Sequence, residues 1–267
     1  MKTRAPHPPP AAAITARARD QLSYRHIVWD WNGTLLDDVQ PAVNAINRML
    51  AARGLPPTDV PSYRATFGFP VRHYYRTIGI ALADAEWDTV AREFHDFFLA
   101  EPGLHLRPEA GSVLRFCREA GCGLAVLSAS EQSILNRMLA DAGLAGFFDH
   151  VQGVDNLYGH SKLEMGRRLL TQLTADGRAL FVGDTLHDHE VATALGCDCL
   201  LIAEGHQTPE RLLAAGCPVV PRLADVPEFL QAAGARYQGP VAPPATSGRM
   251  KRRQQYRTSN KEYPIPK

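Results

Sequence analysis

The sequence predicts an open, doubly wound α/β fold with an all-helical block inserted after the first strand. Short runs of β-type residues alternate with helix-period patterns. The runs are continuously apolar, as expected for parallel strands that are buried on both faces. One long segment, residues 41–104, breaks the alternation, because it contains helical patterns and no convincing strand. Strands and helices joined by short connections favour a Rossmann-like parallel sheet.

Five strands are expected, and the last of them is the weakest: 26–31, 123–129, 179–183, 198–203 and 219–221. The helices between them have recognisable ends, which Ser, Thr, Pro and Gly mark for different backbone reasons. The expected helices are 109–120, which stops at Gly121, one capped by Ser130 that runs to Gly143, and one that opens with Thr208-Pro209-Glu210 and closes at Gly216.

The helical block has apolar residues at helix spacing, such as Ala42, Ile46 and Met49. It follows the first strand, and open α/β sheets bind ligands beyond the carboxyl ends of their strands. An insertion at this place is positioned to be a lid. The expected domains are a core (24–38 and 105–233), a helical cap (39–104), a disordered N-terminal extension (1–23) and a flexible basic C-terminal tail (234–267).

Composition excludes several classes of protein. The chain has 267 residues, a net charge of +1 and 45% hydrophobic residues, so no overall field recruits nucleic acid or an acidic membrane. Its five cysteines form no CxxC pair, which favours reduced thiols in a cytoplasmic protein. No apolar run approaches the roughly 20 residues of a membrane span. The basic cluster at 249–253 predicts a solvated tail, with an RNA contact as the alternative.

The most informative segment is 27–38, which reads Ile-Val-Trp-Asp-Trp-Asn-Gly-Thr-Leu-Leu-Asp-Asp. An apolar run delivers a carboxylate, Asp30, to the end of a strand. A carboxylate in that place can attack an electrophile or hold a metal. Asn32-Gly33 between apolar residues is also a strong hairpin signal, so the segment alone indicates a hairpin as readily as a catalytic loop.

Three further segments could carry chemistry. A strand that ends on Ser128 before a helix start is typical of an anion site, although a plain cap at Ser130 is equally compatible. Lys162 at a helix start opposes the helix dipole, so a phosphate or a carboxylate should compensate it unless it is a solvated surface lysine. Asp184 and Asp188 follow a buried strand at helical spacing, a pattern that suits Mg²⁺.

In chain order these segments resemble the motifs of the haloacid dehalogenase-like hydrolase superfamily. The resemblance covers residues 24–233, includes a helical cap after the first strand, and is nearest to phosphoglycolate-phosphatase-like members that open with Asp-Trp-Asn-Gly-Thr. It implies that Asp30 is the nucleophile and that Lys162 neutralises charge. The implied ligands of Mg²⁺ are Asp30, the backbone carbonyl of Asn32, Asp184 and Asp188, and the implied contacts to the substrate phosphate are Gly33, Thr34, Ser128, Ala129 and Lys162.

Asn32 departs from this pattern. Most phosphatases of the superfamily have an aspartate there, which acts as general acid and base. An amide cannot titrate, and such help is typically worth about 10² to 10⁴ in rate. Three interpretations stay open: the substrate has a good leaving group, another group such as a histidine moves the proton, or the protein hydrolyses slowly and mainly binds its ligand.

Other chemistries of the superfamily fit less well. Dehalogenation needs no metal, which the pair Asp184 and Asp188 argues against. Phosphonate cleavage uses a cap lysine, and no lysine lies between Lys2 and Lys162. The candidate histidines are His187, His189 and His206 near the expected site and His73 in the cap.

We therefore expect a cytoplasmic, Mg²⁺-dependent phosphatase, a monomer or homodimer, that acts on a small phosphorylated metabolite. The alternative is a catalytically weak ligand-binding or regulatory protein of the same fold. A nucleic-acid partner is expected only if the basic tail provides one, and no membrane partner is expected.

Overall fold

The structure is a computed structural model that describes residues 22–81, 83, 86–155, 162–173 and 178–236. The expected N-terminal extension and basic tail lie outside these residues except for 22–23 and 234–236. No helix in the described ranges is long and apolar enough to cross a membrane.

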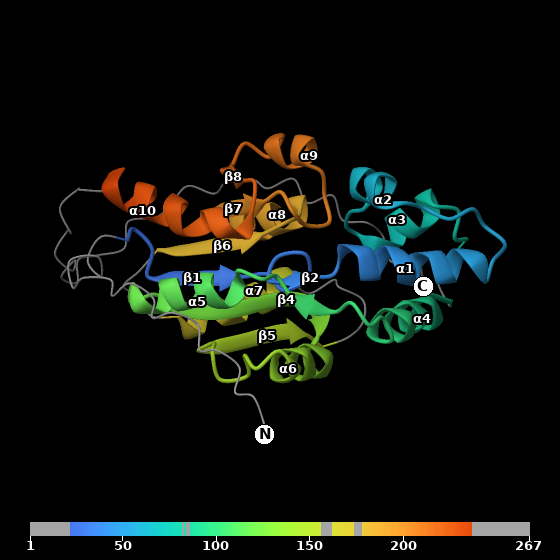
Figure 1. Cartoon of the computed structure of the whole chain (residues 1–267), viewed down its shortest axis with the longest axis horizontal. Coiled ribbons are helices and arrows are strands. Elements are labelled where there is room, and N and C mark those ends of the chain that lie inside the picture. Colours follow the sequence, from blue (N-terminus) through green and yellow to red (C-terminus); the bar gives the residue numbers. More distant parts are fainter. Residues whose placement is uncertain (1–21, 82, 84–85, 156–161, 174–177, 237–267) are drawn as a thin grey trace, which may run out of the picture. The chain divides into compact units, whose positions relative to one another are not determined.

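A six-stranded sheet in the order β5-β4-β1-β6-β7-β8 forms the centre of the protein (Figure 1). All of its pairs are parallel, which confirms the predicted fold class. The first strand lies in the middle, so its carboxyl end is flanked by those of β4 and β6. The strands are β1 (His26–Trp29), β4 (Gly123–Glu131), β5 (His150–Val154), β6 (Ala179–Gly183), β7 (Asp198–Ile202) and β8 (Val219–Val220).

Helices cover both faces of this sheet, and alternate strand residues point to different helices. Ile27 and Trp29 belong to the cluster that includes residues of α5 and α10, whereas Val28 packs with residues of α7 and α8. This alternation explains why the strands are apolar throughout. The helices are α5 (Ala110–Glu119), α6 (Gln132–Asp141), α7 (Lys162–Gln172), α8 (Leu186–Ala194), α9 (Pro209–Leu213) and α10 (Val226–Arg236).

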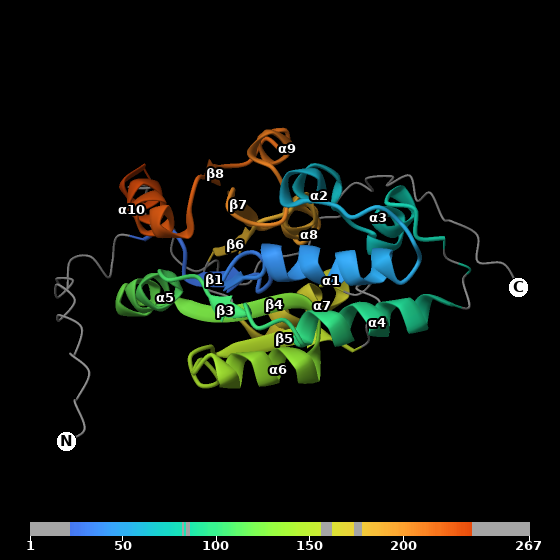
Figure 2. The same ribbon diagram turned by 45° about the vertical axis from the view of Figure 1, so that its right-hand side comes forward.

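Four helices follow β2 (Leu36–Asp37): α1 (Val39–Ala51), α2 (Val60–Thr66), α3 (Val71–Thr77) and α4 (Trp87–Leu99). We call them the helical insertion. The described part of residues 39–104 contains no strand, as predicted. The chain returns through β3 (His105–Leu106), which pairs antiparallel with β2, so both ends of the insertion meet. Helices α1 and α4 pack side by side (Figure 2).

One strand was missed and one helix start was predicted wrongly. Strand β5 was not predicted, because His150 and Gln152 interrupt its apolar pattern at the edge of the sheet. Ser130 does not cap a helix, since β4 runs on to Glu131 and α6 begins one residue later. The side chain of Glu131 accepts the backbone N–H groups of Ser133 and Ile134, each at 3.1 Å.

Candidate active site

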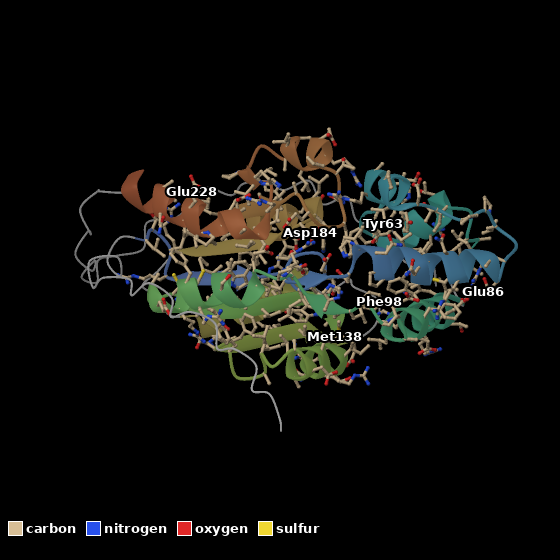
Figure 3. All side chains as sticks on the ribbon, viewed as in Figure 1. Tyr63, Glu86, Phe98, Met138, Asp184 and Glu228 are labelled. Carbon is tan, nitrogen blue, oxygen red and sulfur yellow. The ribbon has the colours of Figure 1, made fainter. Side chains whose placement is uncertain are left out.

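Three buried carboxylates converge beyond the carboxyl ends of the central strands. Asp30 is the first residue after β1, Asp184 follows β6, and Asp188 lies in the first turn of α8. One oxygen of each lies within 4.8 Å of the others. The parallel order of the strands brings them together, because β1 and β6 are neighbours that end at the same edge. Figure 3 shows Asp184 between the sheet and the helical insertion.

Lys162, at the start of α7, joins two of these carboxylates. Its Nζ lies 2.5 Å from Asp30 Oδ1 and 2.5 Å from Asp188 Oδ1, and its side chain is buried. Burial alone would lower the pKa of Lys162, but Asp188 and Asp30 hold that pKa above its ordinary value. The solvated-lysine alternative is therefore wrong, and the two carboxylates supply the compensation that the helix dipole requires.

The cluster retains uncompensated negative charge, since three carboxylates face one ammonium group. Burial, with Asp188 and Asp184 nearby, raises the pKa of Asp30 to about 8, although Lys162 opposes the rise. Burial likewise raises the pKa of Asp184 to about 6. For Asp188 burial acts upward, but the charge and hydrogen bond of Lys162 outweigh it and lower the pKa. A buried set of carboxylate oxygens with excess negative charge fits a hard divalent cation such as Mg²⁺.

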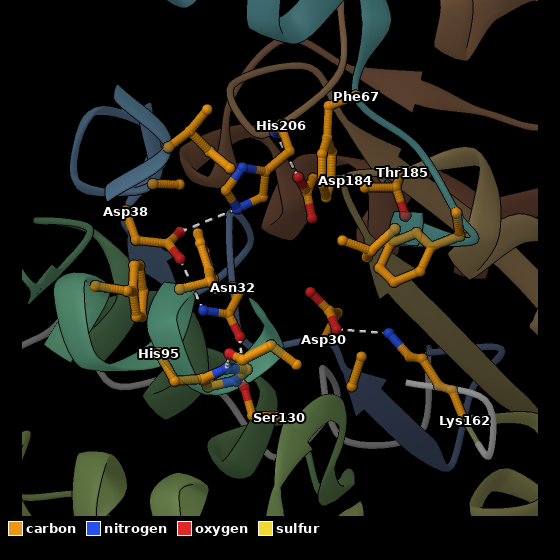
Figure 4. A pocket seen from close by; sticks show the side chains of 18 of the residues that line it. Asp30, Asn32, Asp38, Phe67, His95, Ser130, Lys162, Asp184, Thr185 and His206 are labelled. Carbon is orange, nitrogen blue, oxygen red and sulfur yellow. Dashed lines mark hydrogen bonds and ion pairs between the residues drawn. The ribbon is translucent and has the colours of Figure 1, made fainter. Parts of the chain in front are cut away.

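Asn32 is fixed by hydrogen bonds at both ends of its amide. Its Nδ2 donates to Asp38 Oδ2 at 2.7 Å, and its Oδ1 accepts from Ser130 Oγ at 2.8 Å (Figure 4). Asp38 also accepts the backbone N–H of Gly33 at 2.6 Å. The hairpin alternative for this segment is wrong, because β1 pairs in parallel with β4 and β6. The role of Asp38 in holding this loop was not predicted, although Asp38 belongs to segment 27–38.

His206 links this loop to the helical insertion. Its Nε2 lies 3.2 Å from Asp38 Oδ1 and its Nδ1 lies 2.9 Å from the hydroxyl of Tyr63 on α2. Its backbone N–H donates to Asp184 Oδ2 at 2.6 Å. Burial would lower the pKa of His206, but the Asp38 carboxylate leads a set of acids that raise it to about 9. His206 is thus the candidate histidine that the structure brings into the site.

The other candidate histidines are not lining residues of the pocket, although His187 is near enough to Lys162 and Asp188 for their charges to affect its pKa. His187 stacks on Phe69 with ring centroids 4.5 Å apart. His189 is half-buried on α8, and His73 is exposed on α3. None of these three side chains lines the pocket described below, whereas His95 on α4 does and was not predicted.

The loop after β1 is held by a buried arginine that sequence reasoning missed. Nη2 of Arg107 donates to the carbonyl of Gly33 at 2.8 Å, and its Nε donates to that of Thr34 at 3.2 Å. The hydroxyl of Thr34 donates to Asp184 Oδ1 at 3.1 Å. These contacts place the loop against the carboxylates, and nothing in the local pattern around Arg107 indicates them.

Several of the expected phosphate-binding residues already have hydrogen-bond partners within the protein. Ser128 is buried on β4, and its Oγ accepts the backbone N–H of Ser130 at 3.0 Å. No free helix N-terminus follows it, because Glu131 occupies the first N–H groups of α6. The N–H of Gly33 already donates to Asp38. Ala129 does line the pocket.

A pocket of about 150 Å³ opens beside the carboxylates. One side is formed by the carboxylates, Lys162, Asn32 and His206, and the other by the helical insertion and α6. Tyr63, Phe98 and Met138 mark these walls in Figure 3. The insertion and α6 contribute the following lining residues: Ala42, Ile46, Tyr63, Phe67, Phe69, Val71, Tyr75, Trp87, Ala91, Phe94, His95, Phe98, Ile134 and Met138.

Comparison with known proteins agrees with this arrangement. The family model of haloacid dehalogenase-like hydrolases matches residues 24–196. The probable phosphatase IndB of Dickeya dadantii is 28% identical over 220 residues, which cover 79% of this chain and 93% of that protein. A phosphoglycolate phosphatase of Caulobacter vibrioides is 29% identical over 214 residues (76% and 89%).

A solved structure of a predicted phosphatase from Clostridium acetobutylicum matches with a TM-score of 0.69 at 18% identity, over 78% of this chain and 99% of that one. That likeness supports the fold observed here. Because the family model spans most of the chain and includes the strand ends that carry Asp30 and Asp184, this chain belongs to the haloacid dehalogenase-like hydrolases.

Proposed function

We propose that this hydrolase is an Mg²⁺-dependent phosphatase that acts on a small phosphorylated metabolite. The observation that carries the proposal is the bridge from Lys162 to Asp30 and Asp188 inside a buried carboxylate cluster. Phosphoryl transfer requires a nucleophile in line with the leaving group and positive charge around the phosphate oxygens. The two relatives reported above both have phosphatase names, which supports the same activity.

Asp30 is proposed as the nucleophile. One of its carboxylate oxygens attacks phosphorus, the bond from phosphorus to the ester oxygen breaks, and the electron pair leaves with that oxygen. Water then attacks phosphorus in the aspartyl phosphate, which releases phosphate and restores the carboxylate. Two steps replace one difficult displacement. Bound Mg²⁺ would supply charge neutralisation at the phosphate oxygens.

The other site residues have supporting parts in the proposal. Asp184, Asp188, Asp30 and the backbone carbonyl of Asn32 would hold the cation. Lys162 favours the ionised form of Asp30, and Ser128, Ala129, Gly33 and Thr34 would contact the phosphate.

The helical insertion is proposed as the cap of the site. Besides the contact of Tyr63 with His206, Arg64 Nη2 donates to the carbonyls of Ala203 at 2.6 Å and Gln207 at 2.9 Å. These bonds join α2 to the loop after β7. A cap closed in this way excludes water from the acyl phosphate until the leaving group has departed.

The first test is Asp30→Asn, assayed for phosphate release on a broad panel of phosphate esters with Mg²⁺ or with EDTA. We expect turnover to fall by at least about 10³, because the amide cannot form the acyl phosphate. Asp37→Asn is the matched control: Asp37 lies in β2, is partly exposed, lies 3.5 Å from Arg107 Nη1 and does not line the pocket. Full activity of Asp30→Asn would overturn the mechanism.

The same panel separates the alternative function. A ligand-binding protein would release no phosphate from any ester but would be thermally stabilised by one of them.

A further inference from the structure

We infer that the substrate is a small aryl phosphate, a phosphate ester of a phenol-type hydroxyl. This inference rests on the proposed phosphatase function and narrows its substrate class. Two independent observations support it: the chemistry of the wall that faces the phosphate site, and the hydrogen bonds that occupy Asn32.

The wall formed by the insertion and α6 carries no charged group among its described lining residues. Its polar atoms belong to Tyr63, Tyr75, Trp87 and His95. The Tyr63 hydroxyl is bound to His206, and burial raises the pKa of Tyr75 far above its ordinary value. His95 Nδ1 lies 2.8 Å from the carbonyl of Ala91, and burial lowers the pKa of its ring. The wall is therefore aromatic and uncharged at neutral pH.

Such a wall does not suit a substrate with a second charge. A carboxylate buried beside it would meet no unpaired cation among the described lining residues, because two carboxylates hold Lys162 and Asp38 holds the charged ring of His206. A ring, by contrast, packs against Phe94, Phe98 and Met138. An apolar cavity of about 150 Å³ in another protein holds benzene, so a pocket of this volume can accept one ring.

The leaving group is restricted by the second observation. Asn32 cannot titrate, and both ends of its amide are bound, to Asp38 and Ser130. Nor does His206 replace an acid, because Asp38 and Tyr63 occupy its two ring nitrogens. An ester oxygen that leaves without a proton must be a weak base. Phenols, with a pKa of about 10, meet this condition far better than alkyl alcohols, whose pKa is near that of water at about 16.

The reaction balances without an added acid. Asp30 attacks phosphorus, the bond between phosphorus and the aryl oxygen breaks, and the pair leaves as phenolate. The phenolate takes its proton from water after departure. A second water hydrolyses the aspartyl phosphate as in the proposed function, so no oxidant or reductant is needed.

The test is a two-by-two panel that separates the ring from the leaving group. Phenyl phosphate has both a ring and a good leaving group, benzyl phosphate has the ring alone, acetyl phosphate has the leaving group alone, and 2-phosphoglycolate has neither. We expect kcat for phenyl phosphate to exceed that for benzyl phosphate by about 10² to 10⁴. Its KM should be about ten- to a hundredfold below that of acetyl phosphate.

Variants localise both effects. Phe94→Ala should raise KM for phenyl phosphate more than for acetyl phosphate, while Phe97→Ala, on the same helix but outside the pocket lining, should change neither. Asn32→Asp supplies an acid and should narrow the ratio of phenyl to benzyl phosphate by at least about tenfold. If that variant folds poorly, the ratio of the wild-type protein decides by itself.

The failures are distinguishable. A preference for 2-phosphoglycolate, or equal kcat for phenyl and benzyl phosphate, would overturn the aryl assignment while leaving the phosphatase intact, provided that Asp30→Asn abolishes turnover. No turnover of any of the four compounds, together with no phosphate release from any member of the broad ester panel, would overturn both.

Discussion

At the scale of single residues, the site depends on how closely the loop after β1 approaches the strand ends. Gly33 has φ of +73°, and a Cβ built on it would lie 2.3 Å from Asp184 Oδ2 and 2.5 Å from His206 Cδ2. Only glycine combines this backbone conformation with this contact. The loop can therefore lie against the carboxylates because one position has no side chain.

Gly33→Ala should lose both stability and activity. Left-handed backbone costs an alanine about 1 to 2 kcal/mol, and the overlap with Asp184 adds about 1 to 3 kcal/mol. Displacing Asp184 should lower kcat/KM by about a hundredfold. Urea unfolding and phosphate release measure the two effects.

The matched control is Gly54→Ala. Gly54 has φ of +65°, but nothing lies within 4 Å of its added Cβ. Gly54→Ala should therefore lose only the stability that the left-handed backbone costs an alanine, and it should keep its activity. Equal losses of stability and activity in the two variants would show that the close approach of Gly33 to Asp184 contributes to neither.

At the scale of elements, the polar residues before α6 have two roles: Ser130 belongs to strand β4, and Glu131 caps the helix. The strand β4 continues past Ser128 so that Ser130 can reach Asn32, and Glu131 then caps the helix. The helix brings Ile134 and Met138 to the pocket wall. A helix that began at Ser130 would have removed the partner of Asn32.

Glu131→Ala should destabilise the protein by about 1 kcal/mol, because two N–H groups of the first helical turn lose their acceptor. Arg137→Ala is the control on the same helix: it is exposed, and its removal should cost less than about 0.5 kcal/mol. Thermal unfolding of both variants checks this. A loss for Glu131→Ala no larger than that of the control would contradict the capping role.

At the scale of the whole molecule, His206 joins three parts of the chain: the loop after β1 through Asp38, the insertion through Tyr63, and the loop after β7 on which it lies. Since its pKa is raised from 6.5 to about 9, the charged ring stabilises the folded state. That contribution is fully present below pH 6.5 and is lost as the pH rises through about 9. Its size is on the order of 3 kcal/mol.

His206→Gln should therefore be less stable than the wild-type protein by an amount that shrinks between pH 6.5 and 10. The measurement is urea unfolding across this range with EDTA present, and His73→Gln, at an exposed histidine of α3, is the control. A difference between wild type and His206→Gln that does not change with pH would contradict the charged state of the ring.

Much of the fold could be predicted from local pattern. All five predicted strands were placed within two residues at each end, and the helices of the insertion were predicted from helix spacing. The edge strand β5 could not be predicted, because an edge strand is half-exposed and its sequence, His-Val-Gln-Gly-Val, lacks a continuous apolar run. The start of α6 was missed for a similar reason, since Ser130 and Glu131 are both capping residues and only the partner of Ser130 decides between them.

The candidate site divides in the same way. Asp30, Asp184 and Lys162 were predictable because each follows a buried strand or opens a helix. A charged residue at such a place is unfavourable unless an opposite charge or a ligand compensates it. Asp38 and Arg107 were not, since a buried aspartate and a buried arginine look like solvated charges until their partners are known.

The sequence by itself determined the order of buried strands and the polar residues at their ends, and with these the fold class and the nucleophile proposed at Asp30. The spacing of apolar residues and the residue types are enough to predict these features, because each buried segment must be apolar whatever its neighbours are. Only the tertiary structure decided that Asn32 is bound between Asp38 and Ser130, that Tyr63 reaches His206, and that the facing wall is uncharged. Most of these contacts join residues about 100 or more positions apart, so they depend on which strand ends meet in space, and no local pattern contains that information.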